Sequence, residues 1–424
     1  MQVKTLAISL SLLPGCCLAP PARLHAETIR LEQAVREACE HNRDFVAERA
    51  GLPVAEARLQ TARLRPNPTL SLSADHLDWL GTGFTEANGG GPSEVAVSTE
   101  FTWERAGKRS RRMALAEKER ALVEWELKER RRRLIFEVQN TFIDVMVARE
   151  HRNVAGENLS FMKRIVGVNE ARLKAGDLSE VEVIRSQVAA EQMESALQQA
   201  ELALRLSQNR LLLLMGRSGE SGLPEADGEF RRDSETASPQ EARQSALAGR
   251  PDLRAAAAEE ERAEADLALQ KALRRGDLEL GTEYRRQQGV NGMGNSLGFT
   301  VNVPLPLFDR NQGELARAAA ERNRAALRTA ALRAAILSEV ATALDQQATA
   351  RQQLERIESV LLKKAREVRE VTEYAYQRGE ASLLELLDAE KAYMETMQSY
   401  ALARAEYSRS SYWIDAVTAK DGSK

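Results

Sequence analysis

The chain repeats one plan twice, and this duplication constrains its fold more than any other feature of the sequence. The stretch NRDFVAERAGLPVAEARLQTARLRPNPTLSL, from Asn42, aligns with RPDLRAAAAEEERAEADLALQKALRRGDLEL, from Arg250. At nearly the same separation, AGDLSEVEVIRSQ from Ala175 aligns with RGEASLLELLDAE from Arg378. Self-similarity of this kind indicates two copies of one supersecondary unit. In each copy we predict a helix, a pair of strands, a long helix, a turn and a second long helix.

The duplication also sets the domain organisation and the fold class. Aromatic residues are only 5% of the chain and charged residues are 29%, a balance typical of long solvated helices. The predicted fold is therefore mainly α with a small β part. The expected segments are a signal peptide (1–26), a first repeat (27–215, with a β-hairpin at 68–104 and a helical tip near 176), a connector (216–240), a second repeat (241–418, with a β-hairpin at 277–304 and a tip near 379) and a C-terminal tail (419–424).

Each repeat contains a long stretch without proline, from Lys108 to Lys174 and from Gly313 to Arg378. At a rise of 1.5 Å per residue, either stretch could extend for about 100 Å as a helix. Apolar residues in both recur at alternating threes and fours, which is coiled-coil spacing. They are Ile135, Val138, Phe142 and Val145 in the first stretch, and Leu354, Ile357, Leu361, Val368 and Val371 in the second, where Lys364 interrupts the apolar series. We predict antiparallel helix pairs that fold back at the two tips.

The candidate strands come in two pairs around Gly-rich loops. Each is about ten residues long, enough for a tilted strand to cross a bilayer. Apolar residues alternate with small or polar ones, so that Leu70 and Leu72 share one face, as do Phe299, Val301 and Val303. Four strands cannot close a barrel alone, whereas three chains would contribute about twelve. A small soluble sheet packed on the helices is the alternative.

The N-terminus is typical of an export signal, with Lys4 followed by an apolar run and then by small residues. Cleavage near Ala26 and lipid attachment at Cys16 are both open as processing routes. Beyond the signal, no apolar run is long enough for a membrane-spanning helix. Entry into a membrane would therefore need a closed β-barrel.

Several classes of function are excluded by what the chain carries. Its net charge is −3 with both signs interspersed, so we expect no nucleic-acid partner. The basic run Arg130–Arg133 is predicted to be a solvated, salt-bridged helix face. Only Cys39 would remain after signal cleavage, and the histidines lack ligand spacing, so no metal site and no cofactor are expected. The absence of a phosphate loop, a GxSxG elbow or an HExxH pair argues against an enzyme.

Three motifs resemble TolC-like outer membrane factors, in particular the CzcC-like heavy-metal efflux branch. They are VPLPLFDRNQG (Val303–Gly313), WERAGKR (Trp103–Arg109) and the paired turns AGDLSEVEV and RGEASLLELLDAE. The resemblance covers essentially the whole mature chain. It implies a homotrimer in the outer membrane of a Gram-negative bacterium, with a transmembrane β-barrel of four strands per chain contacting outer-membrane lipid. An α-helical barrel of long antiparallel coiled-coil helices would then form a tunnel into the periplasm.

The function implied is that of a passive channel in a tripartite efflux system. The partners would be a periplasmic membrane-fusion adaptor and an inner-membrane resistance-nodulation-division pump, which supplies the energy. The branch favours divalent or monovalent heavy-metal cations as the cargo, and drugs or small organic compounds are the alternative. From a different class of protein, an exported soluble coiled-coil scaffold is the competing interpretation.

Carried over residue by residue, the resemblance assigns a periplasmic gate to the second tip. Glu385 and Asp388 fall where the family has acidic rings in the lumen, and Glu182 and Tyr376 fall at gate-locking positions. The basic locking residue of the family would fall at Ala381, which cannot form that hydrogen bond. Helix capping in a Ser-x-x-Glu pattern is a competing structural role for Glu182 and Glu385.

Two further sets of residues follow from the same resemblance. The tips that would dock on the adaptor contain Leu173, Ala175, Gly176, Leu178, Ser179, Gly379, Ala381, Ser382 and Leu383. The junction between the barrel and the tunnel contains Pro66, Pro68, Pro304 and Pro306. Proline cannot donate to a strand ladder, so these residues would end the sheet where the chain enters the helices.

Overall fold

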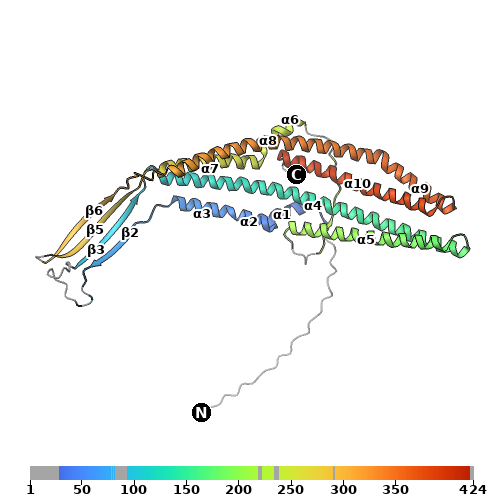
Figure 1. Cartoon of the computed structure of the whole chain (residues 1–424), viewed down its shortest axis with the longest axis horizontal. Helices are drawn as coiled ribbons and strands as arrows, with labels where there is room; N and C mark the ends of the chain where they lie inside the picture. Colours follow the sequence, from blue (N-terminus) through green and yellow to red (C-terminus); the bar gives the residue numbers. More distant parts are fainter. Residues whose placement is uncertain are drawn as a thin grey trace, which may run out of the picture.

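The computed structural model of the chain describes residues 28–77, 79, 81, 93–217, 222–233, 238–289 and 292–420. The predicted signal peptide, with Cys16, lies outside these residues. The described part forms a long, curved rod of helices with a sheet at one end (Figure 1). The prediction of a mainly α fold with a small β part is confirmed.

Both halves of the chain contribute short helices, two sheet strands and a long helical hairpin. The first half has β1 (Thr28–Ile29), α1 (Leu31–His41), α2 (Arg43–Arg49), α3 (Gly51–Arg63), β2 (Thr69–Asp75), β3 (Glu94–Trp103), α4 (Lys108–Ala175) and α5 (Glu180–Leu214). The chain continues with β4 (Glu225–Ala226), α6 (Pro239–Gly249), α7 (Pro251–Leu273), β5 (Leu278–Gly289), β6 (Gly292–Asn302), α8 (Gln312–Arg356), a π-helical turn (Ile357–Leu361), α9 (Leu362–Arg378) and α10 (Leu383–Thr418).

The longest helix, α4, joins the two halves along the rod. It has 68 residues and packs against α3 and α5 of its own half. It also packs against α7 and α10 of the second half, and α8 packs against the same two helices. Both hairpins turn at the same end of the rod, opposite the sheet (Figure 1). The sequence duplication is therefore visible as two similar hairpins that lie side by side.

Two apolar clusters hold the middle of the rod, one in each half. In the first, Val138, Phe142 and Val145 of α4 pack with residues of α1 and of the end of α5. In the second, Ile336 and Val340 of α8 pack with residues of α6 and of the end of α10. The seam predicted from spacing is confirmed for these three α4 residues, whereas the predicted Ile135 is half-buried and its neighbour Leu134 packs in the cluster instead.

The second long stretch differs from the predicted seam, which was expected to continue through Val368 and Val371 beyond the interruption at Lys364. A π-helical turn at Ile357–Leu361 separates α8 from α9. Such a turn takes more residues than an α-helical turn, so it rotates the positions that follow it about the helix axis. Leu354, before the turn, is buried, whereas Val368 and Val371, after it, are 53% and 62% exposed. The seam expected through the latter two residues is therefore wrong within one chain.

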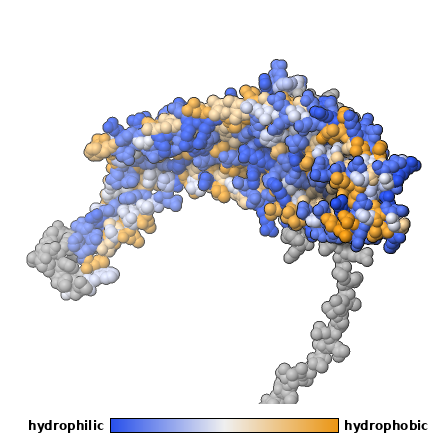
Figure 2. All heavy atoms as spheres, turned by 45° about the vertical axis from the view of Figure 1, so that its right-hand side comes forward, coloured by the Kyte–Doolittle hydropathy of each residue, from blue (hydrophilic) through white to orange (hydrophobic). Residues whose placement is uncertain are grey.

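The sheet contains four antiparallel strands in the order β2-β3-β5-β6, so the two hairpins pair through β3 and β5. Leu72 lies opposite Val97, Val97 opposite Tyr284, and Tyr284 opposite Leu297. One face is therefore apolar across all four strands, and the alternate residues on the other face are mostly Ser, Thr, Glu and Gly. Figure 2 shows apolar surface along the sheet beside polar surface. Both edge strands, β2 and β6, are exposed along their whole length.

The alternation predicted from the sequence is confirmed, since Leu70 and Leu72 share their face with Phe299 and Val301 through β3 and β5. The expected strand length is wrong for β2, which has 7 residues, whereas β3, β5 and β6 have 10, 12 and 11. The extended backbone of β2 ends because the next residue, His76, has a φ of 56°. A left-handed residue cannot continue a strand.

The predicted connector contains a short strand. Within it, β4 pairs in parallel with β1, with Thr28 opposite Glu225 and Ile29 opposite Ala226. Ile29 and Ala226 are both buried in the apolar cluster of the first half. This part of the connector therefore folds back on the start of the first repeat instead of running free between the repeats.

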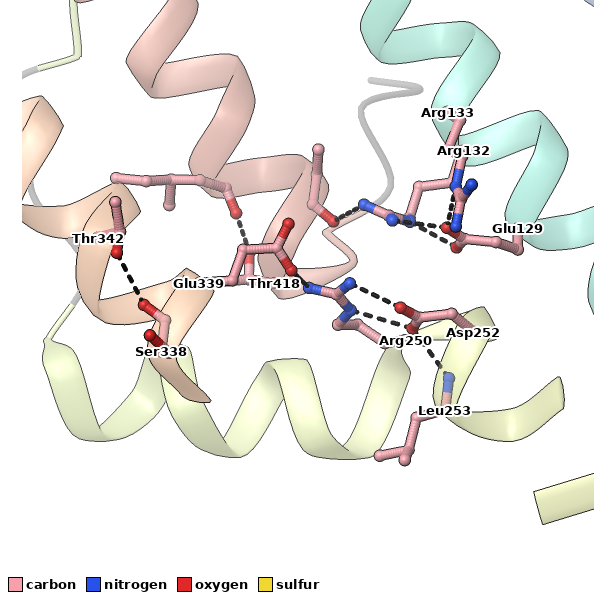
Figure 3. Close-up of polar contacts among 12 residues, drawn as sticks. Glu129, Arg132, Arg133, Arg250, Asp252, Leu253, Ser338, Glu339, Thr342 and Thr418 are labelled. Atoms are coloured by element: carbon pink, nitrogen blue, oxygen red, sulfur yellow. Dashed lines mark hydrogen bonds and ion pairs between the residues drawn. The ribbon is translucent and has the colours of Figure 1, made fainter. Parts of the chain in front are cut away.

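Buried ion pairs join the helices near the middle of the rod (Figure 3). Arg250, at the start of α7, is 4% exposed and pairs with Asp252 through two hydrogen bonds of 3.0 and 2.6 Å. It also pairs with Glu339 of α8. A buried guanidinium needs such partners, because an unpaired charge at this depth would be strongly destabilising.

The prediction of a salt-bridged basic run is confirmed for Arg132 and Arg133, which both pair with Glu129, but the run is not solvated throughout. Arg132 is 15% exposed by its side chain and pairs with Glu129 at 2.8 Å. It also donates to the carbonyl oxygen of Ala416 in α10 at 2.7 Å. This side chain therefore fastens α4 to α10, and the expectation of a solvated face is wrong for it.

The sheet meets the helices at residues that leave little space. Pro68 directly precedes β2, and Pro304 follows the end of β6 by one residue. A Cβ added to Gly276, between α7 and β5, would lie 2.3 Å from Cγ of the Pro304 ring. Nearby, Lys108 Nζ lies 2.7 Å from Asp277 Oδ1, with 6% of the lysine side chain exposed. The side of the junction formed by Gly276 and Pro304 is thus closely packed within one chain.

We expect Gly276→Ala to lower stability, because the proline ring cannot move aside without a shift of its backbone. Overpacking of this kind costs about 1–3 kcal/mol. The matched control is Gly313→Ala, where an added Cβ meets nothing within 4 Å and a small gain is expected. The thermal unfolding midpoint, followed by circular dichroism at one protein concentration, measures both. Equal midpoints for the two variants would contradict the packing described.

Candidate functional site

The end of the rod opposite the sheet carries two turns of the same geometry. Each long helix ends before a left-handed glycine, Gly176 with a φ of 84° and Gly379 with a φ of 77°. In both turns, the N–H of the next residue bonds the carbonyl oxygen five residues earlier at 2.9 Å. This arrangement satisfies carbonyls at the helix end, and only glycine adopts it without strain.

The returning helices are capped by serine, but the two caps differ. Ser179 accepts from the backbone N–H of Glu182 at 3.4 Å. Ser382 accepts from the N–H of Glu385 at 3.3 Å, and Glu385 Oε2 accepts from the N–H of Ser382 at 2.7 Å. The second tip therefore has a complete capping box, while the first has only the serine half.

A buried hydrogen bond joins the two hairpins near the tips. The Tyr376 hydroxyl on α9 donates to Asn169 Oδ1 on α4 at 2.6 Å, and the two residues are 3% and 0% exposed. Arg172 Nη1, also on α4, donates to the carbonyl oxygen of Tyr376 at 3.4 Å. Burial raises the pKa of the Tyr376 phenol, against the opposing effects of Asn169 and Arg172. These contacts hold α9 against α4.

The four residues assigned to a gate lie on three helices, α5, α9 and α10. Glu385 and Asp388 are exposed on α10, and Glu182 is half-buried on α5. Among the described residues the hydroxyl of Tyr376 bonds Asn169 instead of Glu182, although the glutamate acts electrostatically on the tyrosine. The N–H and hydroxyl of Ser382 hold the pKa of the Glu385 carboxyl below its usual value. The ionised carboxylate of Glu385 therefore completes the cap of α10.

The residues assigned to the docking tips differ in exposure. Ala175, Gly176, Ser179, Gly379 and Ser382 are exposed, and Leu173, Leu178 and Ala381 are half-buried. Leu383 is 5% exposed and packs with Tyr376 and Leu386. Leu383 therefore supports the turn from within instead of forming part of its surface.

The sequence did not single out a buried ion pair that begins two residues beyond Asp388. Glu390 on α10 is 1% exposed and accepts from Arg369 Nε of α9 at 2.8 Å. The Arg369 guanidinium lies over the rings of Phe161 on α4 and Tyr393 on α10, at 5.1 and 4.5 Å from their centroids. Burial raises the pKa of the Glu390 carboxyl, while Arg369 opposes the rise.

A signal for these buried polar residues was present in the sequence. Glu390 continues the three-and-four spacing of Leu383 and Leu386, and Asn169 continues that of Ile165. A polar residue at a seam position is buried if the seam is packed, so it needs a partner on the facing helix.

No group of three or more His, Cys, Asp or Glu that could hold a metal ion occurs in the described part of the chain. No helix there is long and apolar enough to cross a membrane.

Comparison with known proteins decides the family. The model of the outer membrane efflux protein family matches residues 34–217 and 242–419, most of the chain. The chain belongs to this family. The predicted resemblance and outer-membrane location are confirmed. Both matched segments end just past the last helix of a hairpin, so the family unit corresponds to the structural repeat.

Relatives of this efflux protein support the same fold. The cobalt-zinc-cadmium resistance protein CzcC of Cupriavidus metallidurans is 25% identical over 376 residues, which cover 88% of this chain and 86% of CzcC. The structure of CusC, studied for transmembrane channel formation, has a TM-score of 0.74 at 18% identity and covers 95% of each chain. The outer membrane channel CmeC of Campylobacter jejuni has a TM-score of 0.76 at 15% identity, covering 98% of this chain and 94% of CmeC.

We expect Tyr376→Phe to loosen the tips of this efflux protein. The change removes the hydroxyl and leaves Asn169 Oδ1 buried without a partner, a loss of about 1–3 kcal/mol. Tyr374→Phe is the matched control, since Tyr374 lies on the same helix but is 56% exposed. Amide hydrogen exchange across α9 and the following turn measures the effect. Equal protection in the two variants would show that the hydrogen bond does not hold the hairpins.

Glu390 should make the stability of the tips depend on pH. Its pKa is higher in the folded than in the unfolded state, so its contribution is full below the unfolded-state value and is lost as pH rises through the folded-state value. Glu390→Gln should therefore flatten the decline in thermal unfolding midpoint with rising pH, compared with the exposed Glu395→Gln. The charged neighbours Arg369, Glu373 and Arg164 remain in both variants. Parallel pH profiles would contradict burial as the cause.

Proposed function

We propose that three copies of this efflux protein form one passive channel. A periplasmic adaptor and an inner-membrane resistance-nodulation-division pump would deliver heavy-metal cations to it, and it would release them outside the cell. The observation that carries the proposal is the sheet, which has one apolar face, one polar face and two unpaired edges. Pairing β6 of one chain with β2 of the next would remove every edge and give about twelve strands, within the range of outer-membrane barrels.

The proposal also places a gate and a docking surface at the end of the rod opposite the sheet. Glu385 and Asp388, exposed one helical turn apart on α10, would present about six carboxylates around a narrow opening in the trimer. Such rings attract cations in general and repel one another when charged. The exposed glycine and serine residues of the two turns would meet the adaptor.

The cargo assignment depends on the relatives and on these carboxylates. CzcC is named a cobalt-zinc-cadmium resistance protein, and its match extends over most of both chains. An acidic opening suits cations and disfavours anions. A family-wide channel architecture alone would serve organic cargo equally well, so the cargo needs its own test.

The test of the gate is ion selectivity in a planar bilayer. The double variant Glu385→Gln and Asp388→Asn removes the charges, while glutamine keeps the capping box that alanine would break. We expect the cation-to-anion permeability ratio, read from the reversal potential in a salt gradient, to fall by about tenfold. Glu201→Gln, an exposed acid on α5 far from the tips, is the control. An unchanged ratio in the double variant would remove the gate from the proposal.

The test of the cargo is metal tolerance in cells that lack their own channel but retain the pump and adaptor. The intact protein should restore growth in zinc, cobalt or cadmium, and the double variant should restore it less. Restored tolerance to organic compounds without any change in metal tolerance would favour drugs as the cargo.

A further inference from the structure

A pocket of about 360 Å³ lies where the sheet meets the helices, at the opposite end of the rod from the proposed gate. Residues from three segments line it: Arg65 and Pro66 before β2, Phe101, Thr102, Trp103 and Glu104 at the end of β3, and Gly107, Lys108 and Arg109 at the start of α4. The pocket combines guanidinium groups, aromatic rings and a proline, whereas the tips carry exposed carboxylates. This pocket has no role in conduction or docking as described above.

Two of the charged residues that line the pocket, Lys108 and Glu104, have partners of opposite charge. Lys108 pairs with Asp277 at 2.7 Å, and the carboxylate of Glu104 is held by Arg112. Glu104 is the only carboxylate among the described residues that line the pocket. The two pairs leave the arginines as its only uncompensated charges among the described residues.

Arg65 and Arg109 keep their positive charge without a carboxylate partner. The side chain of Arg65 is exposed and makes no hydrogen bond or ion pair within the described part of the chain. Arg109 uses only Nε, which donates to the carbonyl oxygen of Arg63 at 2.6 Å. Within the described residues, its two terminal nitrogens have no partner and can donate to another acceptor. A pair of guanidinium groups in this state suits a phosphate, which accepts two parallel N–H bonds from one arginine.

The apolar part of the pocket continues the apolar face of the sheet. Phe101 and Trp103 stand on the same face as Val97 and are 43% and 59% exposed. Beyond β6, Leu305 and Phe308 are 73% and 90% exposed. Aromatic residues next to basic ones, at the end of an apolar strand surface, are typical of the level where lipid headgroups lie.

We propose that Arg65 and Arg109 bind the phosphate of an anionic phospholipid in the periplasmic leaflet of the outer membrane. The acyl chains would lie along Phe101 and Trp103 on the apolar face. The proposal rests on the proposed function, because it requires that face to contact lipid. The lipid is favoured over a second protein chain as the occupant because the uncompensated charge calls for an anion and the adjoining surface calls for hydrocarbon.

Native mass spectrometry of the assembled protein, extracted in mild detergent, tests the site. Phosphatidylglycerol is the anionic probe, phosphatidylcholine is the zwitterionic control, and inorganic phosphate tests for binding of the free ion. We expect phosphatidylglycerol to bind more tightly than phosphatidylcholine, with inorganic phosphate competing poorly. Arg65→Gln should weaken phosphatidylglycerol binding by about fivefold, the effect of one basic residue near a membrane surface.

Matched variants separate the site from general charge. Arg243→Gln removes an exposed arginine of α6, far from the sheet, and should leave lipid binding unchanged. Arg65→Lys keeps the charge but loses the two parallel N–H bonds, so its affinity should lie between those of the unchanged protein and of Arg65→Gln. Equal binding of the two lipids, or equal affinity of Arg65→Gln and Arg243→Gln, would overturn the lipid site while leaving a trimeric channel intact. A protein that is monomeric in the same spectrum would instead overturn the proposed function and the lipid site together.

Discussion

An antiparallel sheet with one apolar face and two unpaired edges is not a stable end state for a chain in water. Here four strands expose apolar side chains along one face, and β2 and β6 present free hydrogen-bonding groups along both edges. The helices cannot cover this sheet, because it projects beyond the end of the rod (Figure 1). Both the exposed face and the exposed edges therefore require other molecules, and the proposed trimer in a lipid bilayer provides both.

The rest of the architecture follows from the duplication, because the two repeats contribute equivalent parts. Each repeat contributes one strand pair, one long hairpin and one apolar cluster, and α4 and α10 fasten the repeats through buried polar contacts such as Arg132 to Ala416. The copies have diverged in their long hairpins. Only the second tip has a complete capping box, and only the second hairpin has a π-helical turn. The second hairpin also carries the two exposed carboxylates assigned to the gate.

Periodicity in the sequence predicted those elements whose burial is decided within one helix or strand. The seam through Val138 and Phe142 and the alternation through Leu70 and Leu72 follow directly from periods of about 3.6 and 2 residues. Pairing between segments that lie far apart in the sequence was harder to predict. The contact of β3 with β5 and the two-residue pairing of β1 with β4 carry no periodic signal of their own. The π-helical turn depends on packing that spacing alone does not encode.

The candidate site was predictable in outline, because the glycine and serine positions of the tips define both turns and both caps. The partners that hold the tips were not identified, although Asn169 and Glu390 occupy seam positions where a polar residue is costly unless paired. Tyr376 shows the same limit. Its position was assigned to a lock, but only the structure gives its partner on α4.

The central claim is that the sheets of three chains close on one another in the outer membrane. The most direct measurement is the native mass of the protein extracted from the isolated outer-membrane fraction, with and without boiling. The account predicts three copies in that fraction, reduced to single chains by heat. A monomer or dimer recovered from the soluble fraction would contradict it, because the apolar face and free edges of the sheet would then have no partner.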